Sequence, residues 1–175
     1  MVYPLPAVMV SCGDFNNANI ITVAWTGTIC TNPAMTYISI RPERYSYDII
    51  KNTGEFVINL TTKKLARSTD FAGVRSGKDI NKFEVLKLTK EKANEVNVPL
   101  IKESPINIEC KVTEIKELGS HHMFIAKVLC VDVDEKYLDK TGRLNMEKCG
   151  LIAYSHGQYF ELGESLGRFG FSVKK

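Results

Sequence analysis

The sequence predicts an all-β-dominated fold in which short strands form a closed or nearly closed antiparallel barrel. Three observations support this prediction. Short β-branched and aromatic runs alternate with turn residues over the first sixty positions. Only the stretch near residues 45–72 has apolar residues at helical spacing. A parallel α/β sheet would need a regular alternation of strand and helix, and that alternation is missing after residue 84.

The expected strands are separated by turn residues along the whole chain. Residues 106–115 give the clearest pattern, because their apolar and polar side chains alternate as in a half-exposed antiparallel strand. A turn at Leu118-Gly119-Ser120 leads into a long partner strand over residues 121–133. The remaining expected strands are residues 7–12, 20–25, 36–40, 55–60 and 150–154.

Two helices are expected between these strands. The first covers residues 45–52, and Gly54 stands just past its end, where a C-cap glycine belongs. The second runs from residue 63 to about residue 71, with Thr61 or Thr62 as its N-cap. Residues 73–79 are expected to form a loop and residues 83–99 an irregular segment. The part from Gly157 onward, rich in glycine and aromatic residues, receives no assignment.

Length and charge limit the classes of protein to which the chain can belong. A chain of 175 residues suits a single domain, residues 1–175. The formal net charge is +3 with acids and bases mixed, so no basic stripe for nucleic acid is present. No apolar run approaches the roughly 20 residues that span a bilayer, and residues 1–6 do not resemble a signal peptide. We therefore expect a cytoplasmic protein with no membrane or nucleic-acid partner.

The cysteines predict neither disulfides nor a metal site. There are five, spaced widely and irregularly, and no C-x-x-C pair occurs. An odd number without a secretory signal argues against a disulfide framework, and zinc or iron–sulfur ligation usually needs clustered thiolates. We expect reduced, mostly buried thiols that pack as small hydrophobic residues.

One segment has the residues of an anion site. Arg41-Pro42-Glu43-Arg44-Tyr45-Ser46 places two guanidinium groups and a hydroxyl at the N-terminus of an expected helix. Free N–H groups, the helix dipole and arginine all favour a phosphate there. A capped helix with solvated arginines explains the same residues equally well. The loop at Ser76-Gly77-Lys78 offers another cation, although such loops are commonly just solvated. Dinucleotide, P-loop and nucleophile-elbow motifs are all absent from the sequence.

These pieces together resemble the flavin reductase-like FMN-binding split-barrel family, and its flavoredoxin-like branch in particular. The stretch NIITVAWTGTICTNPAMTYISIRPERYSYDIIKNTGEFVINL, residues 19–60, is similar to that branch nearly throughout. SGKDINKF at residues 76–83 and LGSHHMFIAKV at residues 118–128 are similar to two further signatures, and residues 154–170 resemble the family's tail. The resemblance touches most of the chain in the expected order. Ala34 and Ala72 depart from the pattern, which usually has a proline and a cysteine at these positions.

The resemblance implies a six-stranded antiparallel Greek-key split barrel that forms a homodimer, with FMN bound non-covalently near the interface. Thr22, Ala24, Trp25 and Thr26 would line the flavin ring and ribityl chain, and Arg41, Arg44 and Ser46 would meet the phosphate. The whole set of implied cofactor-binding residues is Asn19, Thr22, Ala24, Trp25, Thr26, Arg41, Arg44, Ser46, Asn59, Ser76, Gly77 and Lys78.

His121 is the implied catalytic residue, near the ring where family members admit a nicotinamide or another electron partner. His121 and His122 are adjacent in an expected strand, so they face opposite ways and only one of them can line the site. The resemblance favours His121.

Two functions remain open at this level. The chain is either an oxidoreductase that reduces flavin or another acceptor with NADH or NADPH, or an FMN electron carrier that serves a redox protein partner. FMN is preferred to FAD, because the Arg41, Arg44 and Ser46 cluster suits a terminal phosphate and no adenine site is recognisable.

Overall fold

The computed structural model describes residues 2–173, and the ends of the expected domain, residues 1 and 174–175, lie outside the described part. The strands are β1 (Leu5–Pro6), β2 (Val8–Cys12), β3 (Asn19–Val23), β4 (Thr26–Thr31), β5 (Ala34–Ile40), β6 (Glu55–Leu60), β7 (Lys90–Glu91), β8 (Leu100–Ile101), β9 (Ile106–Leu118), β10 (His121–Val133), β11 (Ile152–Ser155) and β12 (Gln158–Glu161). The helices are α1 (Tyr45–Thr53), α2 (Ala66–Val74) and α3 (Lys82–Val85), with short 3-10 turns η1 (Lys63–Leu65), η2 (Glu135–Tyr137), η3 (Met146–Cys149) and η4 (Phe171–Val173).

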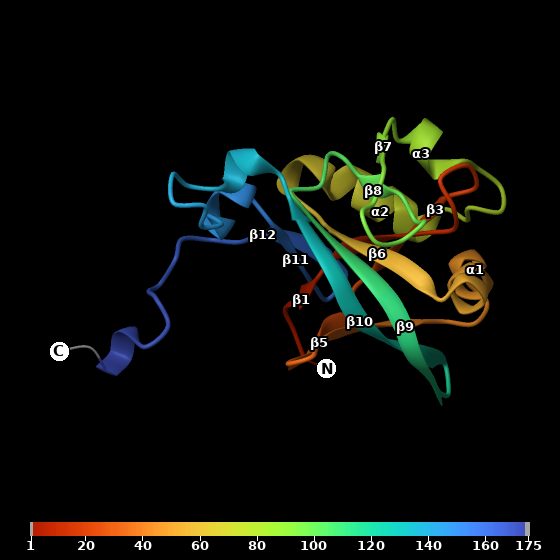
Figure 1. The fold of residues 1–175 in the computed structure, drawn as a ribbon, viewed down its shortest axis with the longest axis horizontal. Helices are drawn as coiled ribbons and strands as arrows, with labels where there is room; N and C mark the ends of the chain where they lie inside the picture. Colours follow the sequence, from red (N-terminus) through yellow and green to blue (C-terminus); the bar gives the residue numbers. More distant parts are fainter. Residues whose placement is uncertain (1, 174–175) are drawn as a thin grey trace.

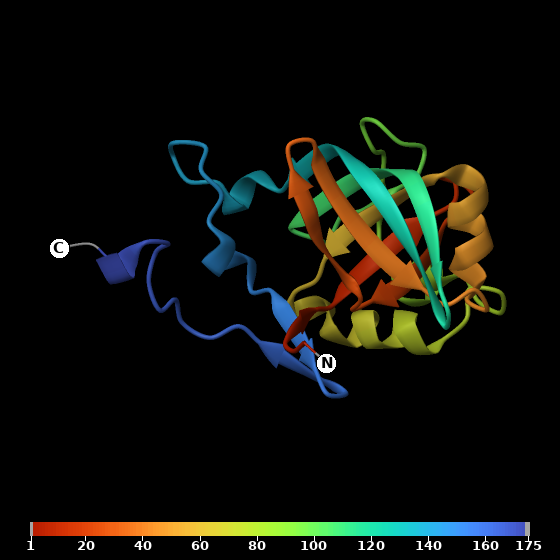
Figure 2. The same ribbon diagram turned by 90° about the horizontal axis from the view of Figure 1, so that it is seen from below.

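Seven antiparallel strands form one strongly curved sheet in the order β3-β2-β6-β9-β10-β5-β4 (Figure 1). The two edge strands of this sheet are also neighbours in sequence, because only residues 24 and 25 separate β3 from β4. So short a connection spans at most about 10 Å. The edges of the sheet must therefore meet, which makes the sheet a barrel (Figure 2). The predicted antiparallel β-barrel class is confirmed.

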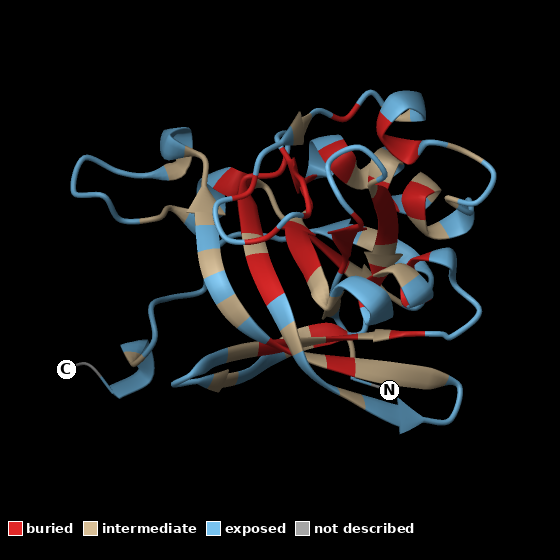
Figure 3. Cartoon of the chain, turned by 45° about the vertical axis from the view of Figure 1, so that its right-hand side comes forward, coloured by how far each residue is buried: buried red, intermediate tan, exposed pale blue. Residues whose placement is uncertain are grey.

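The interior of the barrel follows from the period-two alternation of the strands. Val8, Val10 and Cys12 of β2 point into the main apolar cluster, where they join Phe56 and Phe124. The outward face of the same strand is covered as well, so all five of its residues are buried. Figure 3 shows this burial concentrated in one half of the sheet, whereas the last residues of β9 are exposed and the first residues of β10 are half-buried.

The helix predictions are confirmed in position but wrong in one detail. α1 ends where expected, since Gly54 adopts φ 68° and its N–H donates to the Ile50 carbonyl at 2.8 Å. The second predicted helix starts as the 3-10 turn η1, and α2 follows from Ala66. Thr62 occupies the N-cap position of η1, as predicted, but neither threonine side chain makes a capping hydrogen bond. The Thr61 hydroxyl donates instead to the Ala7 carbonyl, and Thr62 makes no capping bond to any described residue.

The predicted count of six barrel strands is wrong by one. Thr26–Thr31, a polar run broken by glycine, forms the additional edge strand β4 and pairs with β5. The expected strand at 150–154 does occur as β11, but it lies in a separate three-stranded sheet between β1 and β12. β12 falls in the unassigned tail, and α3 lies in the segment expected to be irregular.

The chain beyond β12 leaves the barrel. Residues 162–173 extend away from it in Figure 2, and Leu166 and Phe169 are almost fully exposed. None of the described helices is both long and apolar enough to cross a membrane.

Candidate functional site

A well-formed cleft lies where the barrel edge at β3 approaches the end of β5. Its volume is about 480 Å³, within the usual range for a small-molecule site. Strands β3 and β5, helix α2 and the β11–β12 hairpin all contribute to its wall. We call this space the ring cleft, and its lining residues are Ala7, Ile21, Thr22, Val23, Ala24, Trp25, Ser39, Ile40, Arg41, Arg44, Asp70, Gly73, Val74, His121, Tyr154, Gly157 and Tyr159.

Two flat side chains stand together at the ring cleft. The rings of Trp25 and His121 are nearly parallel, with an interplanar angle of 12° and centroids 5.9 Å apart. The imidazole is held by Ser120, whose Oγ lies 3.0 Å from His121 Nδ1. His122 faces the other way, with its Nδ1 2.7 Å from the Tyr47 hydroxyl. The strand alternation thus places His121, and not His122, at the cleft.

The far end of the ring cleft is aromatic and acidic. Tyr154 and Tyr159 pack edge to face with centroids 5.5 Å apart. The Tyr159 hydroxyl donates to Asp70 Oδ1 at 3.3 Å. Burial, together with the Asp70 charge, raises the pKa of Tyr159 to about 12, so this phenol stays protonated.

A second, smaller pocket of about 260 Å³ adjoins the ring cleft and shares Ile21, Arg44 and Gly73 with it. We call it the anion pocket. Helix α1 starts here with Arg44 as its N-cap, and no side chain within residues 2–173 caps it. The Tyr47 N–H donates to the Arg44 carbonyl at 2.8 Å, but the N–H groups of Tyr45 and Ser46 have no partner among the described residues. These two groups are open to a ligand at the positive end of the helix dipole. The lining residues are Asn19, Ile21, Glu43, Arg44, Tyr45, Ser46, Ala72, Gly73, Arg75, Ser76, Gly77 and Lys82.

The wall of the anion pocket is held rigidly. Ser46 and Asn19 are both buried, and Asn19 Nδ2 donates to Ser46 Oγ at 2.8 Å. A Cβ atom on Gly77 would lie 2.0 Å from Asn19 Oδ1. Only glycine lets the loop approach this closely, which explains the glycine of the Ser-Gly-Lys loop.

Lys82 was not among the predicted site residues, yet it is the most unusual group in the anion pocket. Its side chain is buried, and Nζ donates to the carbonyls of Ile20 in β3 and Ala72 in α2 at 2.6 and 2.7 Å. Within the described chain it forms no ion pair with an acid. Burial lowers its pKa to about 8, and the nearby Arg44 charge acts in the same direction. A buried cation with no acidic partner is costly unless an anion joins it.

The charges around the anion pocket favour a doubly charged anion. Arg44, Arg75 and Lys82 line it against a single acid, Glu43. That acid is itself paired with Arg41, whose Nη1 lies 3.0 Å from Glu43 Oε1. A partly aromatic cleft joined to a cationic pocket fits a flavin ring at one end and a terminal phosphate at the other.

Most of the predicted residues line one of these two spaces. Arg41 is placed on the ring cleft and not in the anion pocket. Three predicted residues lie outside both spaces. The Thr26 hydroxyl donates to the Tyr37 carbonyl, and Lys78 is exposed beside the loop. Asn59 is fully buried on the opposite face of the sheet. Its Nδ2 donates to the Met9 carbonyl, and its Oδ1 accepts the Ile101 N–H.

The fold and the cleft together indicate a flavin-binding β-barrel. Comparison with known proteins gives the same class. The model of the flavin reductase-like domain matches residues 1–163, and the chain belongs to that family. It is 30% identical to the flavoredoxin of Desulfovibrio vulgaris (Miyazaki F), with a TM-score of 0.92 over 99% of this chain and 95% of that one.

Two further matches extend the comparison. An uncharacterised protein of Pyrococcus abyssi is 32% identical over 96% of both chains. An FMN-binding protein of Thermus thermophilus with bound 1-cyclohex-2-enone shares the fold, with a TM-score of 0.81 at 21% identity over 95% of this chain and 90% of that one. The split-barrel fold expected from the sequence is thereby confirmed.

Proposed function

We propose that the chain is an FMN-binding flavoprotein that transfers electrons and reduces flavin or another acceptor with NADH or NADPH as donor. The observation that carries this proposal is the junction of the two spaces, where Arg44 lines both the ring cleft and the anion pocket. FMN, when bound, would supply the redox chemistry, since a flavin accepts a hydride or electrons and passes them on. Membership of the flavin reductase-like family supports the same conclusion.

The chain's own residues would bind and orient the cofactor. Arg44, Lys82 and the free N–H groups of α1 would hold the phosphate through charge-assisted hydrogen bonds. The Thr22 hydroxyl already donates to the Thr69 carbonyl. Thr22 therefore fixes α2 against β3 and contributes to the cleft through its carbon atoms. Trp25 and His121 would restrict the plane of the ring, and Gly73 leaves room beside Thr22.

Reduction by nicotinamide is tested directly by anaerobic mixing of the flavin-loaded protein with NADH and, separately, with NADPH. Rapid loss of the flavin's visible absorbance without any partner protein supports a reductase. His121→Ala should slow this reduction more than it weakens FMN binding, because the imidazole stands at the mouth of the cleft and not in the anion pocket. Failure of both nicotinamides to bleach the flavin would exclude the reductase proposal.

An electron carrier is the alternative, and the 30% identity to a flavoredoxin favours it. A carrier would hold FMN in the same way but accept electrons only from a redox protein. Bleaching by dithionite combined with no reaction toward either nicotinamide would indicate this function.

We further propose a cytoplasmic homodimer. The five cysteines are free thiols, as in a reducing compartment. Exposed apolar side chains of β10, namely Leu129 and Val131, and others along residues 162–173 offer surface that a second copy would cover. Light scattering of the FMN-loaded protein at micromolar concentration should give the mass of a dimer, and a monomer would contradict this.

A further inference from the structure

A cluster of polar groups lies on the outer face of the sheet, on the side away from the barrel interior. Glu109 of β9 is fully buried there, and it accepts main-chain N–H groups from Asn94, Glu95 and Val96 at 2.7–3.0 Å. Glu109 therefore ties the segment before β8 to the sheet.

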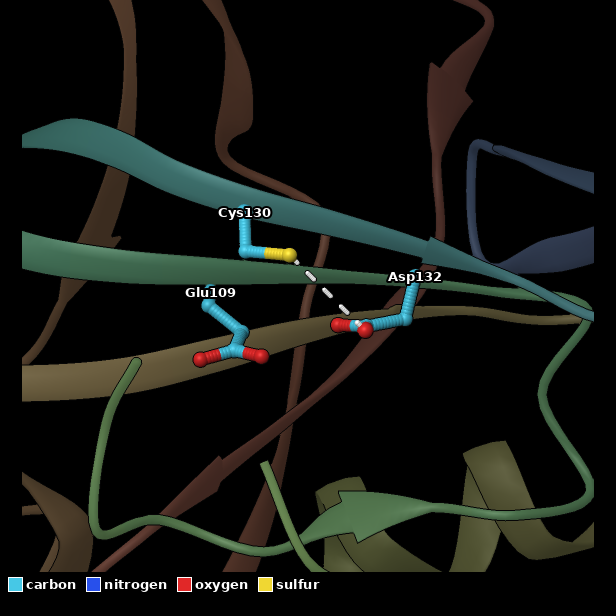
Figure 4. A group of neighbouring side chains, drawn as sticks. All are labelled: Glu109, Cys130 and Asp132. Atoms are coloured by element: carbon cyan, nitrogen blue, oxygen red, sulfur yellow. Dashed lines mark hydrogen bonds between the residues drawn. The ribbon is translucent and has the colours of Figure 1, made fainter. Parts of the chain in front are cut away.

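A second acid and a thiol lie beside Glu109. The register of β9 and β10 places Cys130 opposite Glu109, with Asp132 two residues further on the same face. One ligand atom from each of the three residues lies within 4.8 Å of the others, and Figure 4 shows the three side chains converging. Cys130 Sγ lies 3.8 Å from Asp132 Oδ1, which also accepts Asn94 Nδ2 at 2.6 Å.

Two oxygen atoms of this face are left without any donor. Asp132 Oδ2 and Asn107 Oδ1 are both buried, and neither has a hydrogen-bond partner among residues 2–173. The two residues are direct cross-strand partners, and Asn107 is only 5% exposed. An unpaired buried acceptor costs free energy, and two neighbouring carboxylates repel each other when both are charged. Burial and Glu109 accordingly raise the pKa of Asp132.

We propose that Glu109, Cys130 and Asp132 form a binding site for a thiophilic divalent cation such as Zn²⁺, with Asn107 completing the polar wall. A cation would satisfy the unpaired oxygens and remove the repulsion between the two acids. Carboxylate oxygens and a cysteine sulfur are ligands that zinc accepts, and ligand atoms around tetrahedral zinc lie about 3.3–3.8 Å apart. The side chains therefore need only small shifts to close on an ion.

The site has an entrance and a structural role. Asn107 and Asp132 line a pocket of about 440 Å³ that also contains Asp134 and Lys136. An ion could enter from there without opening the barrel. Asn94 donates to both carboxylates, so a bound ion would fasten the segment before β8 to β9 and β10.

The experiment is calorimetric titration of the flavin-loaded protein with Zn²⁺, in buffers of different ionisation enthalpy. We expect one zinc to bind per chain, with the Cys130 thiol proton released to the buffer as the Zn–S bond forms. Co²⁺ should give absorption bands to the red of the flavin spectrum, as thiolate-bound cobalt does. Millimolar Ca²⁺ should not displace the zinc, because calcium prefers oxygen ligands alone.

Asp132→Asn and Cys130→Ser are the decisive variants. Each removes one ligand and keeps the size of the side chain, so zinc affinity should fall by at least about 100-fold, the upper end of the loss for an outer-shell partner. Glu114→Gln on the exposed part of β9, the strand that carries Glu109, is the matched control and should bind zinc like the parent. Flavin content and melting temperature check that each variant is folded. If zinc does not bind to the parent, or binds to both ligand variants as tightly as to the parent, the proposal is overturned. The two acids would then share a proton instead of holding a cation.

Discussion

Lys82→Met is the substitution that most sharply tests the anion pocket. The lysine ammonium has three N–H donors, and two of them already bond the carbonyls of Ile20 and Ala72. The third is free for a phosphate oxygen. A hydrogen bond between charged groups contributes roughly 1.5–3 kcal/mol, so the variant should bind FMN about 10- to 150-fold more weakly.

The assay compares FMN with riboflavin, which has the same ring and ribityl chain but no phosphate. In the parent, FMN should bind much more tightly than riboflavin. Lys82→Met should reduce that preference and leave riboflavin affinity nearly unchanged. Lys78→Met is the control, because Lys78 is an exposed cation in the neighbouring loop and lies outside the anion pocket. A Lys82→Met protein that keeps the full preference for FMN, or loses both ligands equally, would refute the reasoning.

The same lysine predicts a pH dependence. Its pKa of about 8 in the free protein should rise when a dianionic phosphate binds beside it. Above pH 8 the free protein carries a neutral lysine, so binding must take up a proton, and FMN affinity should fall as pH rises further, by up to about tenfold per unit. Riboflavin affinity should not follow this curve. A flat FMN profile between pH 7 and 10 would contradict the assignment.

Two other substitutions test neighbouring parts of the site. Arg44→Ala should weaken FMN binding by about 10- to 150-fold while the melting temperature of the apo protein stays within the change expected for about 0.5 kcal/mol. The stabilisation by added FMN should shrink accordingly, and an unchanged increment would place the phosphate elsewhere. Gly77→Ala would drive a methyl group into Asn19 and should weaken FMN binding without affecting riboflavin to the same extent. Gly163→Ala meets no atom within 4 Å and serves as its control in the same titration.

The barrel could be predicted because its strands carry local signals. Alternation, β-branched runs and glycine turns marked β2, β3, β5, β6, β9 and β10 closely. The edge strand β4 lacked such a signal, since Thr-Gly-Thr is polar and suits a strand only through its pairing with β5. The additional small sheet depends on β1 meeting β11, a contact between the two ends of the chain that no local pattern encodes.

The site could be predicted where its chemistry is contiguous in sequence. Arg44 and Ser46 belong to one helix start, and His121 follows from the resemblance and from strand alternation. Lys82 could not be predicted, because its burial depends on carbonyls 62 and 10 residues away. Asn59 was expected in the pocket from the family resemblance, but the register turns its side chain to the covered outer face of the sheet.

The emission of Trp25 gives the most direct test of the central claim that FMN binds in the ring cleft. Trp25 is the only tryptophan of the chain and lines that cleft, so its fluorescence is most strongly affected by a flavin bound in this space. Titration of the apo protein with FMN should quench the emission strongly and saturate at one FMN per chain. FAD should quench less at equal concentration, because the anion pocket fits a terminal phosphate. Emission that stays unchanged while FMN binds, as followed by the flavin's own absorbance, would place the cofactor elsewhere and contradict the account.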